Sequence, residues 1–166
     1  PDTKNTRSGF NMITDLLPPG AVLHGVSAAD KPALLAMLAS HAAQFCAIDA
    51  ARIAEAVSAR ELLGTTGFGG GIAIPHARLA GLDHMVAVLA TLATPVDYGA
   101  LDGAPVDLVV LLLAPVEAGA EPLKALARIS RLLRDAALVE KLRAAPSAEA
   151  LAKLLGVGVA VQDRAA

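Results

Sequence analysis

The sequence predicts an α/β fold of three layers, with helices on both faces of one central sheet. Two long apolar segments, residues 85–92 and 106–113, are nearly continuous rather than alternating, which is typical of central strands covered on both faces. Segments with helical features precede and follow them, so helices are expected on either side of the sheet. The 166 residues match one ordinary domain, and no linker or internal repeat divides the chain.

A strand and a helix are expected near the start of the domain. Residues 21–26 are the candidate first strand, and a helix should follow as far as about Ala43. Asp30 or Ser27 is its candidate N-cap, and Pro32 is tolerated in the first turn.

A second helix is expected between Asp49, its N-cap, and Gly64, which supplies the stop. Apolar residues between them fall near helical spacing. Arg60 and Glu61 therefore lie at the end of a helix that leads into a glycine-rich loop.

Three more helices are expected after the apolar segments. They cover residues 122–134, 136–144 and 148–155, and Ser147 caps the last of them. Residues 95–105, between the apolar segments, are polar and rich in turn formers.

The chain is expected to have a domain core and two short ends. Residues 12–156 form the single expected domain, with Met12 as a candidate natural start. Residues 1–11 are expected to be a leader or an expression remnant, and residues 157–166 a loosely held tail.

Composition and charge argue against several classes of function. The formal net charge of −2 argues against a general nucleic-acid binder, which is usually basic. No apolar run approaches the roughly 18 residues of a membrane span, and the start of the chain lacks the apolar core of a signal peptide. The single cysteine, Cys46, cannot form an internal disulfide. We therefore expect a cytoplasmic protein that neither binds nucleic acid nor inserts into a membrane.

The most informative stretch is Gly-Thr-Thr-Gly-Phe-Gly-Gly-Gly-Ile-Ala-Ile-Pro-His at residues 64–76. Glycines allow the backbone to expose consecutive N–H groups, and such runs can form anion-binding concavities. Pro75 removes a ladder donor and stops the expected buried strand over residues 72–74. The imidazole of His76 is thus expected at a strand end beside a loop suited to oxyanions, which is a plausible place for a phosphorylated histidine.

This stretch, together with Arg60 and Glu61, resembles the signature of the enzyme IIA components of the bacterial phosphoenolpyruvate-dependent phosphotransferase system (PTS), in the branch for fructose, mannitol and nitrogen regulation. The Ile-Ala-Ile-Pro-His ending is its specific part, and the likeness extends from about Ile13 to about Gly156. The resemblance implies the type-2 EIIA fold, three α/β/α layers with a mixed sheet. It also implies that His76 accepts a phosphoryl group from a small histidine phosphocarrier of the HPr or NPr type.

Chemistry and resemblance together give further site candidates. A neutral ring nitrogen of His76 is a good nucleophile near pH 7, and its phosphoramidate can hand the group on. Arg60 is expected to contact the phosphoryl group or the donor, because a guanidinium fits a tetrahedral dianion. Glu61 is expected to orient Arg60 or the loop, and Thr66 to fix the tautomer of the imidazole.

The loop backbone and one lysine are further candidates for phosphate binding. The glycines concerned are Gly67, Gly69, Gly70 and Gly71. Relatives often carry asparagine at the position of Gly70 and a second active-site histidine near Lys124. Lys124 therefore either replaces that histidine near His76 or belongs to a solvated basic helix face.

No cofactor is expected. The loop lacks the Gly-Lys-Ser/Thr of a Walker A motif, and Ile72 stands where a dinucleotide-binding fingerprint needs glycine. No histidine or cysteine spacing typical of a metal site occurs in the sequence.

Three downstream roles remain open. A sugar-branch protein would pass its phosphoryl group to a IIB domain of a permease. A nitrogen-regulatory protein would instead bind partners such as potassium transporters or sensor kinases according to its phosphorylation state. The lack of an attached IIB-like domain and of the second histidine favours the regulatory branch. The third role, motivated by Gly70 and Lys124, is a binding module of the same fold that has lost transfer.

Overall fold

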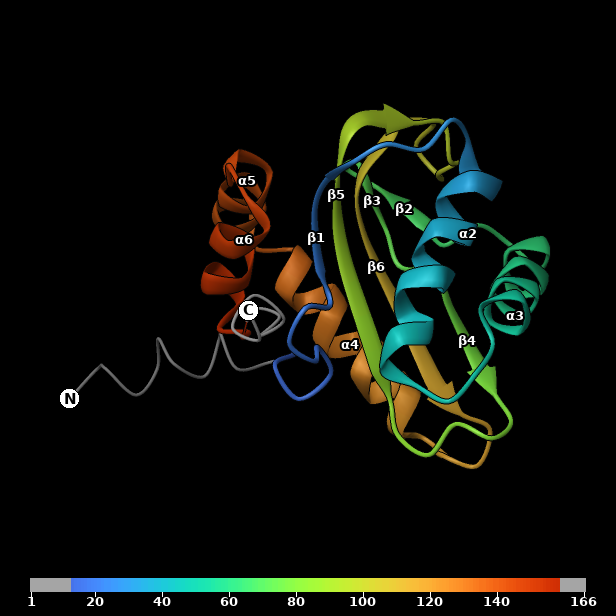
Figure 1. The fold of residues 1–166 in the computed structure, drawn as a ribbon. Coiled ribbons are helices and arrows are strands. Elements are labelled where there is room, and N and C mark those ends of the chain that lie inside the picture. Colours follow the sequence, from blue (N-terminus) through green and yellow to red (C-terminus); the bar gives the residue numbers. More distant parts are fainter. Residues whose placement is uncertain (1–12, 159–166) are drawn as a thin grey trace.

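The computed structural model describes residues 13–158 and shows three layers, with helices on both faces of a central sheet (Figure 1). Within these residues the sheet has six strands. They are β1 (Val22–Val26), β2 (Gly67–Gly69), β3 (Ile72–Ala73), β4 (His76–Leu79), β5 (Val86–Val96) and β6 (Val106–Pro115). The predicted three-layer α/β fold is confirmed.

Strand β6 connects the two halves of a mixed sheet. The strand order is β1-β5-β6-β3-β2, and β4 also pairs with β6. β1 is parallel to β5, β5 is antiparallel to β6, and β3 and β4 are both parallel to β6. β2 turns back antiparallel to β3. β4 therefore lies at an edge of the sheet, where its side chains can border a surface site.

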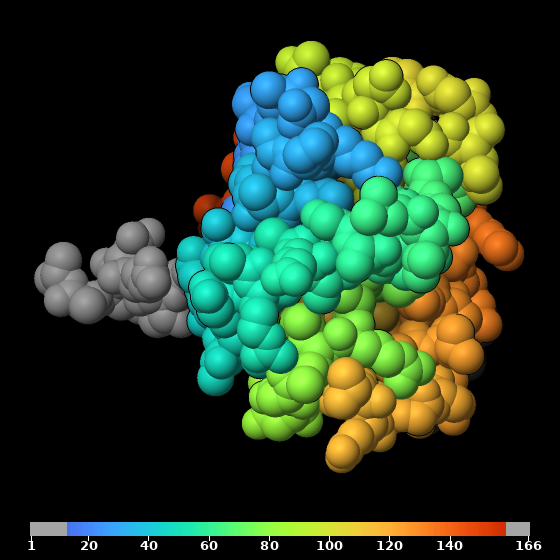
Figure 2. Space-filling view, turned by 90° about the vertical axis from the view of Figure 1, so that its right-hand side faces the viewer, coloured from blue at the N-terminus to red at the C-terminus, as the bar shows by residue number. Residues whose placement is uncertain are grey.

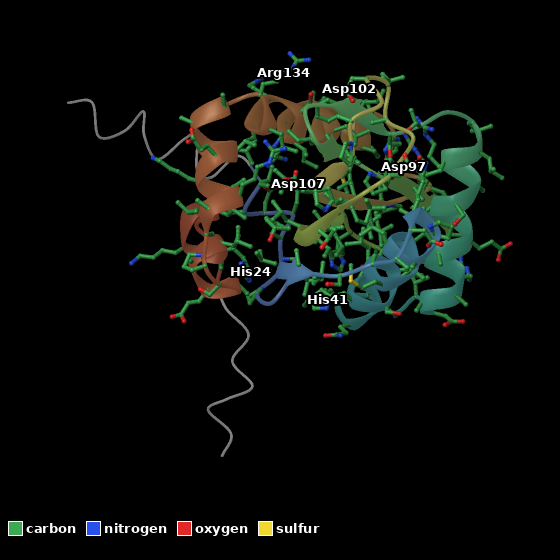
Figure 3. The ribbon with its side chains drawn as sticks, turned by 90° about the horizontal axis from the view of Figure 1, so that it is seen from above. His24, His41, Asp97, Asp102, Asp107 and Arg134 are labelled. Carbon is green, nitrogen blue, oxygen red and sulfur yellow. The ribbon has the colours of Figure 1, made fainter. Side chains whose placement is uncertain are left out.

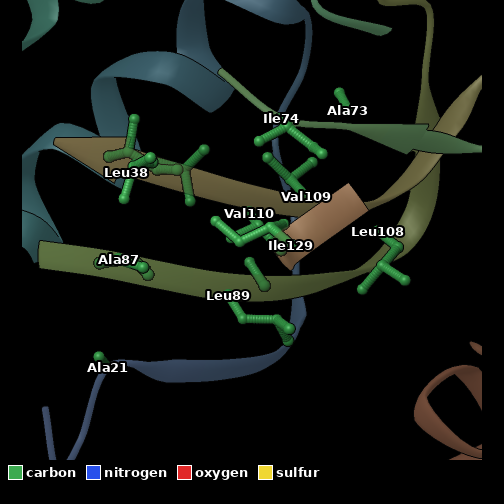
Figure 4. Close-up of a cluster of buried hydrophobic side chains, with 14 of the residues drawn as sticks. Ala21, Leu38, Ala73, Ile74, Ala87, Leu89, Leu108, Val109, Val110 and Ile129 are labelled. Atoms are coloured by element: carbon green, nitrogen blue, oxygen red, sulfur yellow. The ribbon is translucent and has the colours of Figure 1, made fainter. Parts of the chain in front are cut away.

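The two predicted central strands form the core. β5 and β6 pair from Val86 opposite Leu113 onward, and Leu89 opposite Val110 is fully buried on both strands. Leu38 and Ile129, one from each helical layer, are fully buried beside them (Figure 4). Coverage of both faces explains why these strands have continuous apolar sequences.

Five α-helices cover the sheet within the described residues. They are α2 (Lys31–Ala42), α3 (Ala50–Leu62), α4 (Glu121–Leu133), α5 (Ala136–Ala144) and α6 (Ala148–Leu155). A short 3-10 turn, Ala43–Phe45, follows α2. α2 and α3 lie on one face and α4 on the other, while α6 packs beside β1 (Figure 1).

Side-chain caps set the starts of α2, α3 and α6 as expected. Asp30, rather than Ser27, caps α2, and its carboxylate accepts a hydrogen bond from the N–H of Ala33 at 2.9 Å. Asp49 caps α3, and Ser147 caps α6. Each cap satisfies a backbone donor that the first turn of a helix leaves open.

The glycine-rich stretch differs from the sequence expectation of a loop before a single strand. Residues 67–73 form a tight hairpin of β2 and β3, whose turn uses positive φ angles of +115°, +68° and +80° at residues 69–71. β3 ends at Ala73, and His76 begins a separate strand, β4. Strands of two to four residues contain too few positions for a periodic pattern, so the sequence does not reveal them.

The ends of the chain are described only in part. The expected leader over residues 1–11, the start at Met12 and most of the expected tail, residues 159–166, lie outside the described residues. The first residue of that tail, Val157, donates its N–H to the carbonyl oxygen of Ala152 at 2.8 Å. In residues 13–158, no helix has the length and apolar character needed to cross a membrane.

Candidate functional site

A cavity of about 400 Å³ lies at the edge of the sheet, between α3, β4 and the start of α4. Figure 2 faces this side of the molecule, with α3 across the middle and the β4 segment and the residues around the start of α4 below it. His76 lines the cavity, together with Arg60 and Arg78. The apolar part of the lining comes from α3, β6 and α4, chiefly Ala59, Leu63, Leu112, Pro122, Leu123 and Leu126.

The imidazole of His76 is held in one orientation by the backbone just before it. Its Nδ1 lies 2.9 Å from the carbonyl oxygen of Ile74. A carbonyl oxygen only accepts hydrogen bonds, so Nδ1 must carry the proton. In the neutral ring, Nε2 then keeps its lone pair and is the nucleophilic nitrogen. His76 is half-buried, so this nitrogen belongs to a side chain that remains partly accessible.

Among the described residues, the charged side chains that line this cavity with His76 are both arginines. Nη1 of Arg60 donates to the carbonyl oxygen of Gly64 at 2.9 Å. Nη2 of Arg78 donates to the carbonyl oxygen of Gly119 at 2.9 Å. A guanidinium has five N–H donors, so each arginine retains donors for an anion after these contacts. The cavity is therefore suited to a negatively charged group.

Glu61, next to Arg60, is the centre of a polar cluster below the surface. Its carboxylate accepts hydrogen bonds from the hydroxyls of Thr66 and Tyr98, the latter at 2.9 Å. Lys31 forms an ion pair with it at 2.8 Å, and only 5% of the Glu61 side chain is exposed. The Lys31 ammonium also lies 4.2 Å from the centre of the Tyr98 ring, a cation–π contact.

The donors around Glu61 determine its charge state. Burial raises the pKa of the Glu61 carboxyl, but its hydrogen bonds with Lys31, Thr66 and Tyr98 together outweigh burial and hold that pKa below its ordinary value. Burial also raises the pKa of the Tyr98 hydroxyl, which therefore stays protonated and donates. The carboxylate is thus ionised at neutral pH.

The cluster joins segments that are distant in the sequence. It links the start of α2, the end of α3, the entry to β2 and the loop after β5. Oε2 of Glu61 also accepts the backbone N–H of Thr66 at 3.2 Å. Glu61 therefore holds the segment that follows Arg60.

Thr66 lies in this cluster rather than against the imidazole. Its hydroxyl donates to Glu61 and lies 2.9 Å from the hydroxyl of Tyr98. Thr66 was expected to fix the tautomer of His76. In the structure, the hydrogen-bond partner of Nδ1 is instead the carbonyl oxygen of Ile74.

The hairpin turn that contains Gly69, Gly70 and Gly71 lies well away from His76. The carbonyl oxygen of Gly71 accepts the N–H of Asp107 at 3.0 Å, whereas His76 pairs with Leu112 on the same strand. Five strand residues separate these levels, which is about 16 Å. The glycine turn and the imidazole therefore lie at different levels of β6, rather than side by side as the sequence predicts.

The N–H groups of two glycines, Gly70 in this turn and Gly67 in β2, are also already used. The N–H of Gly70 donates to the carboxylate of Asp102, on the loop after β5 (Figure 3), at 3.0 Å. The N–H of Gly67 donates to the hydroxyl of Thr65 at 3.1 Å. These two N–H groups therefore anchor the hairpin to neighbouring protein acceptors.

The structure places Lys124 outside the cavity lining. Its side chain is 69% exposed, and its ammonium lies 3.4 Å from the carboxylate of Glu121. Arg78, which is not among the site residues expected from the sequence, supplies a cation at the cavity instead. A signal was present, because Arg78 follows His76 by two residues and shares its face if the segment is a strand.

Comparisons with known proteins support the resemblance seen in the sequence. A family model described as "Phosphoenolpyruvate-dependent sugar phosphotransferase system, EIIA 2" matches residues 15–156. The chain is 46% identical over 145 residues to a nitrogen regulatory protein of Bradyrhizobium diazoefficiens, covering 87% of this chain and 95% of the relative. It is 43% identical over 144 residues to a nitrogen regulatory protein of Pseudomonas aeruginosa, covering 86% of this chain and 94% of the relative.

A solved structure gives the same result for the fold. The nitrogen regulatory protein IIA-Ntr from Neisseria meningitidis is 32% identical and superposes with a TM-score of 0.79, covering 87% of this chain and 99% of that one. The expected type-2 IIA fold is thereby confirmed.

Replacement of Glu61 tests the polar cluster. We expect Glu61→Gln to lower the free energy of unfolding at pH 7 by about 2 kcal/mol, because it removes the charge that pairs with Lys31 and accepts two hydroxyls. The native-state pKa of Glu61 is lowered, so its contribution is present at neutral pH and is lost as the pH falls through that pKa. The gap between wild type and variant should therefore narrow below about pH 4, measured by urea unfolding.

A matched control is Glu55→Gln, at an exposed position of the same helix. It should change stability by less than about 0.5 kcal/mol at either pH. A stability gap for Glu61→Gln that stays constant down to pH 3 would contradict the proposed charge effect.

Proposed function

Because the chain belongs to the EIIA 2 family of the phosphoenolpyruvate-dependent sugar phosphotransferase system, we propose that it is a phosphocarrier whose His76 accepts a phosphoryl group from a histidine phosphocarrier of the HPr or NPr type. The observation that carries the proposal is the state of His76. Its Nδ1 is engaged by the carbonyl oxygen of Ile74, and the ring lines a cavity that it shares with two cationic side chains.

The transfer step is an in-line displacement between two imidazoles. The lone pair of Nε2 of His76 forms a bond to phosphorus, and the bond from phosphorus to the donor nitrogen breaks. The electron pair of that bond returns to the donor ring, which reacts with its other nitrogen protonated and so leaves as a neutral imidazole. His76 keeps the proton on Nδ1, which faces the carbonyl oxygen of Ile74. Catalysis of this step requires mainly positioning and stabilisation of charge on the phosphoryl oxygens. Arg60 is the candidate for a charge-assisted contact to those oxygens, as its guanidinium chemistry predicts.

The rim of the cavity has the apolar character expected of a docking surface for the donor. Leu63 is 84% exposed at the end of α3, and Leu123 is 67% exposed at the start of α4. Both residues line the cavity that contains His76. Exposed leucines around a half-buried reactive group favour a protein partner, because a partner covers them while it delivers the phosphoryl group.

The downstream role that the comparisons favour is regulation. The two curated relatives and the solved neighbour described above are all named nitrogen regulatory proteins. We therefore propose that the phosphorylation state of His76 controls binding to target proteins in the cytoplasm, of which potassium transporters and sensor kinases are the expected kinds. The family description, which names sugar transport, keeps transfer to a IIB domain as a second candidate.

Phosphorylation by the complete relay tests the main proposal. After incubation with phosphoenolpyruvate, enzyme I and the histidine phosphocarrier, the wild-type protein should gain one acid-labile phosphoryl group by intact mass. His76→Gln should gain none, and NMR of the labelled ring should show phosphorus on Nε2. His84→Gln is the matched control, since His84 is exposed and bonded to Asp83, and it should be labelled like wild type. A wild-type protein that a charged donor leaves unmodified would instead be a binding module.

Substitutions on the rim test the docking surface. We expect Leu63→Asp and Leu123→Asp each to slow transfer from the phosphocarrier by about tenfold, because a charged side chain disfavours an apolar interface. Labelling of His76 by the small donor phosphoramidate should be unchanged. Leu101→Asp, at a leucine that is 76% exposed outside the cavity lining, is the control and should transfer normally. Equal slowing with both donors would place the effect in the site itself rather than in docking.

Onward transfer distinguishes the two downstream roles. The phosphorylated protein should keep its phosphoryl group when mixed with purified fructose-type and mannitol-type IIB domains, because a regulatory protein has no such acceptor. Intact mass of both proteins over time provides the measurement. Appearance of the group on a IIB domain at a rate similar to that of the donor step would favour the sugar role.

A further inference from the structure

We propose that Arg78 is a second phosphoryl-binding residue of the His76 site, an assignment that rests on the proposed function. Arg78 lies on β4 two residues after His76. His76 pairs with Leu112 and Arg78 with Ala114 on the parallel strand β6, so both side chains leave the same face of the sheet. Two strand residues span about 6.6 Å, a distance that an arginine side chain bridges.

The guanidinium of Arg78 is already oriented in the absence of a phosphoryl group. Its Nη2 donates to the carbonyl oxygen of Gly119, just before α4, at 2.9 Å. This bond occupies one of five donors and holds the plane of the group at the cavity. A side chain held in place beforehand loses less conformational entropy when it binds an anion.

The hydrogen-bond partner of Arg78 is neutral, so the positive charge of the guanidinium is not compensated by it. Gly119 offers a neutral carbonyl, and within residues 13–158 no ion pair joins Arg78 to a carboxylate. The nearby carboxylate of Glu121 lies 3.4 Å from the ammonium of Lys124. A cation at the cavity, for which Lys124 was one candidate, is thus supplied from β4.

Two arginines then meet the phosphoryl group from different elements. Arg60 enters the cavity from α3, and Arg78 enters it from β4. A phosphoryl group on Nε2 carries close to two negative charges and three acceptor oxygens, which two guanidinium groups can share. The arrangement predicts a phosphohistidine whose dianionic form is favoured at neutral pH.

The test measures the ionisation of the phosphoryl group itself. His76 is labelled with phosphoramidate, which needs no protein donor, and His76→Ala identifies its ³¹P resonance. A nearby cation lowers the pKa of the phosphoryl group, so Arg78→Gln should raise that pKa by about half a unit or more. The same variant should slow transfer from the phosphocarrier by about tenfold. Arg78→Lys keeps the charge, so the pKa of its phosphoryl group should lie close to the wild-type value. Its transfer rate should recover less, because lysine lacks the planar guanidinium.

The matched control is Arg52→Gln. Nη2 of Arg52 also donates to a backbone carbonyl oxygen, that of Ala80 at 2.6 Å, but Arg52 does not line the cavity. It should leave the ³¹P titration and the transfer rate as in wild type. If Arg78 had only a structural role, Arg78→Gln would change the stability of the protein without changing the ³¹P titration. If Arg78→Gln does not fold, Arg78→Lys still provides the test.

The outcomes separate this assignment from the proposed function. A titration of Arg78→Gln that matches wild type overturns the assignment, whatever the donor does. A second outcome is a shifted titration of Arg78→Gln together with a wild-type protein that accepts no phosphoryl group from the charged phosphocarrier. This outcome supports Arg78 as a phosphoryl-binding residue and overturns the relay role. Failure of both phosphoramidate and the charged phosphocarrier to label His76 overturns both.

Discussion

The position of His76 depends on how the chain passes from β3 to β4 along β6. Both strands pair in parallel with β6, and Pro75 lies in the gap between them. Proline has no N–H, so the ladder is interrupted there. The carbonyl oxygen of Ile74 then accepts a hydrogen bond from Nδ1 of His76, while that of Pro75 accepts the N–H of Leu112 at 2.9 Å. An interruption in the sheet thus orients the imidazole and leaves Nε2 with its lone pair.

The cluster around Glu61 supports the site from below. A carboxylate that is 5% exposed is stable there only because an ammonium, two hydroxyls and a backbone N–H surround it. These donors come from three separate segments, so the cluster fixes the end of α3, where Glu61 lies, relative to the sheet. Arg60 is the residue before Glu61, and its place at the cavity depends on that fixed helix end.

The long elements and their layers were predictable because their patterns extend over many residues. The two central strands are continuous apolar runs, and several of the helices carry side-chain caps such as Asp49 and Ser147. The short strands β2 and β4 lack such patterns, and without β4 the shared face of His76 and Arg78 was not visible. The partners of Glu61 were also beyond sequence reasoning, because the order of residues does not show that Lys31 and Tyr98, 30 and 37 positions away, meet it.

The glycines of the signature have a structural explanation that does not involve phosphate. A Cβ on Gly67 would lie 2.9 Å from side-chain atoms of Tyr98 and Ala100, and one on Gly71 would lie 2.5 Å from the guanidinium of Arg143. The turn between β2 and β3 also needs positive φ angles, which glycine adopts without strain. Close packing and turn geometry therefore account for the glycines. Under the proposed function, side chains of the cavity must then stabilise the charge of a phosphoryl group at His76. In the described part of the chain, the cationic side chains that line the cavity are Arg60 and Arg78.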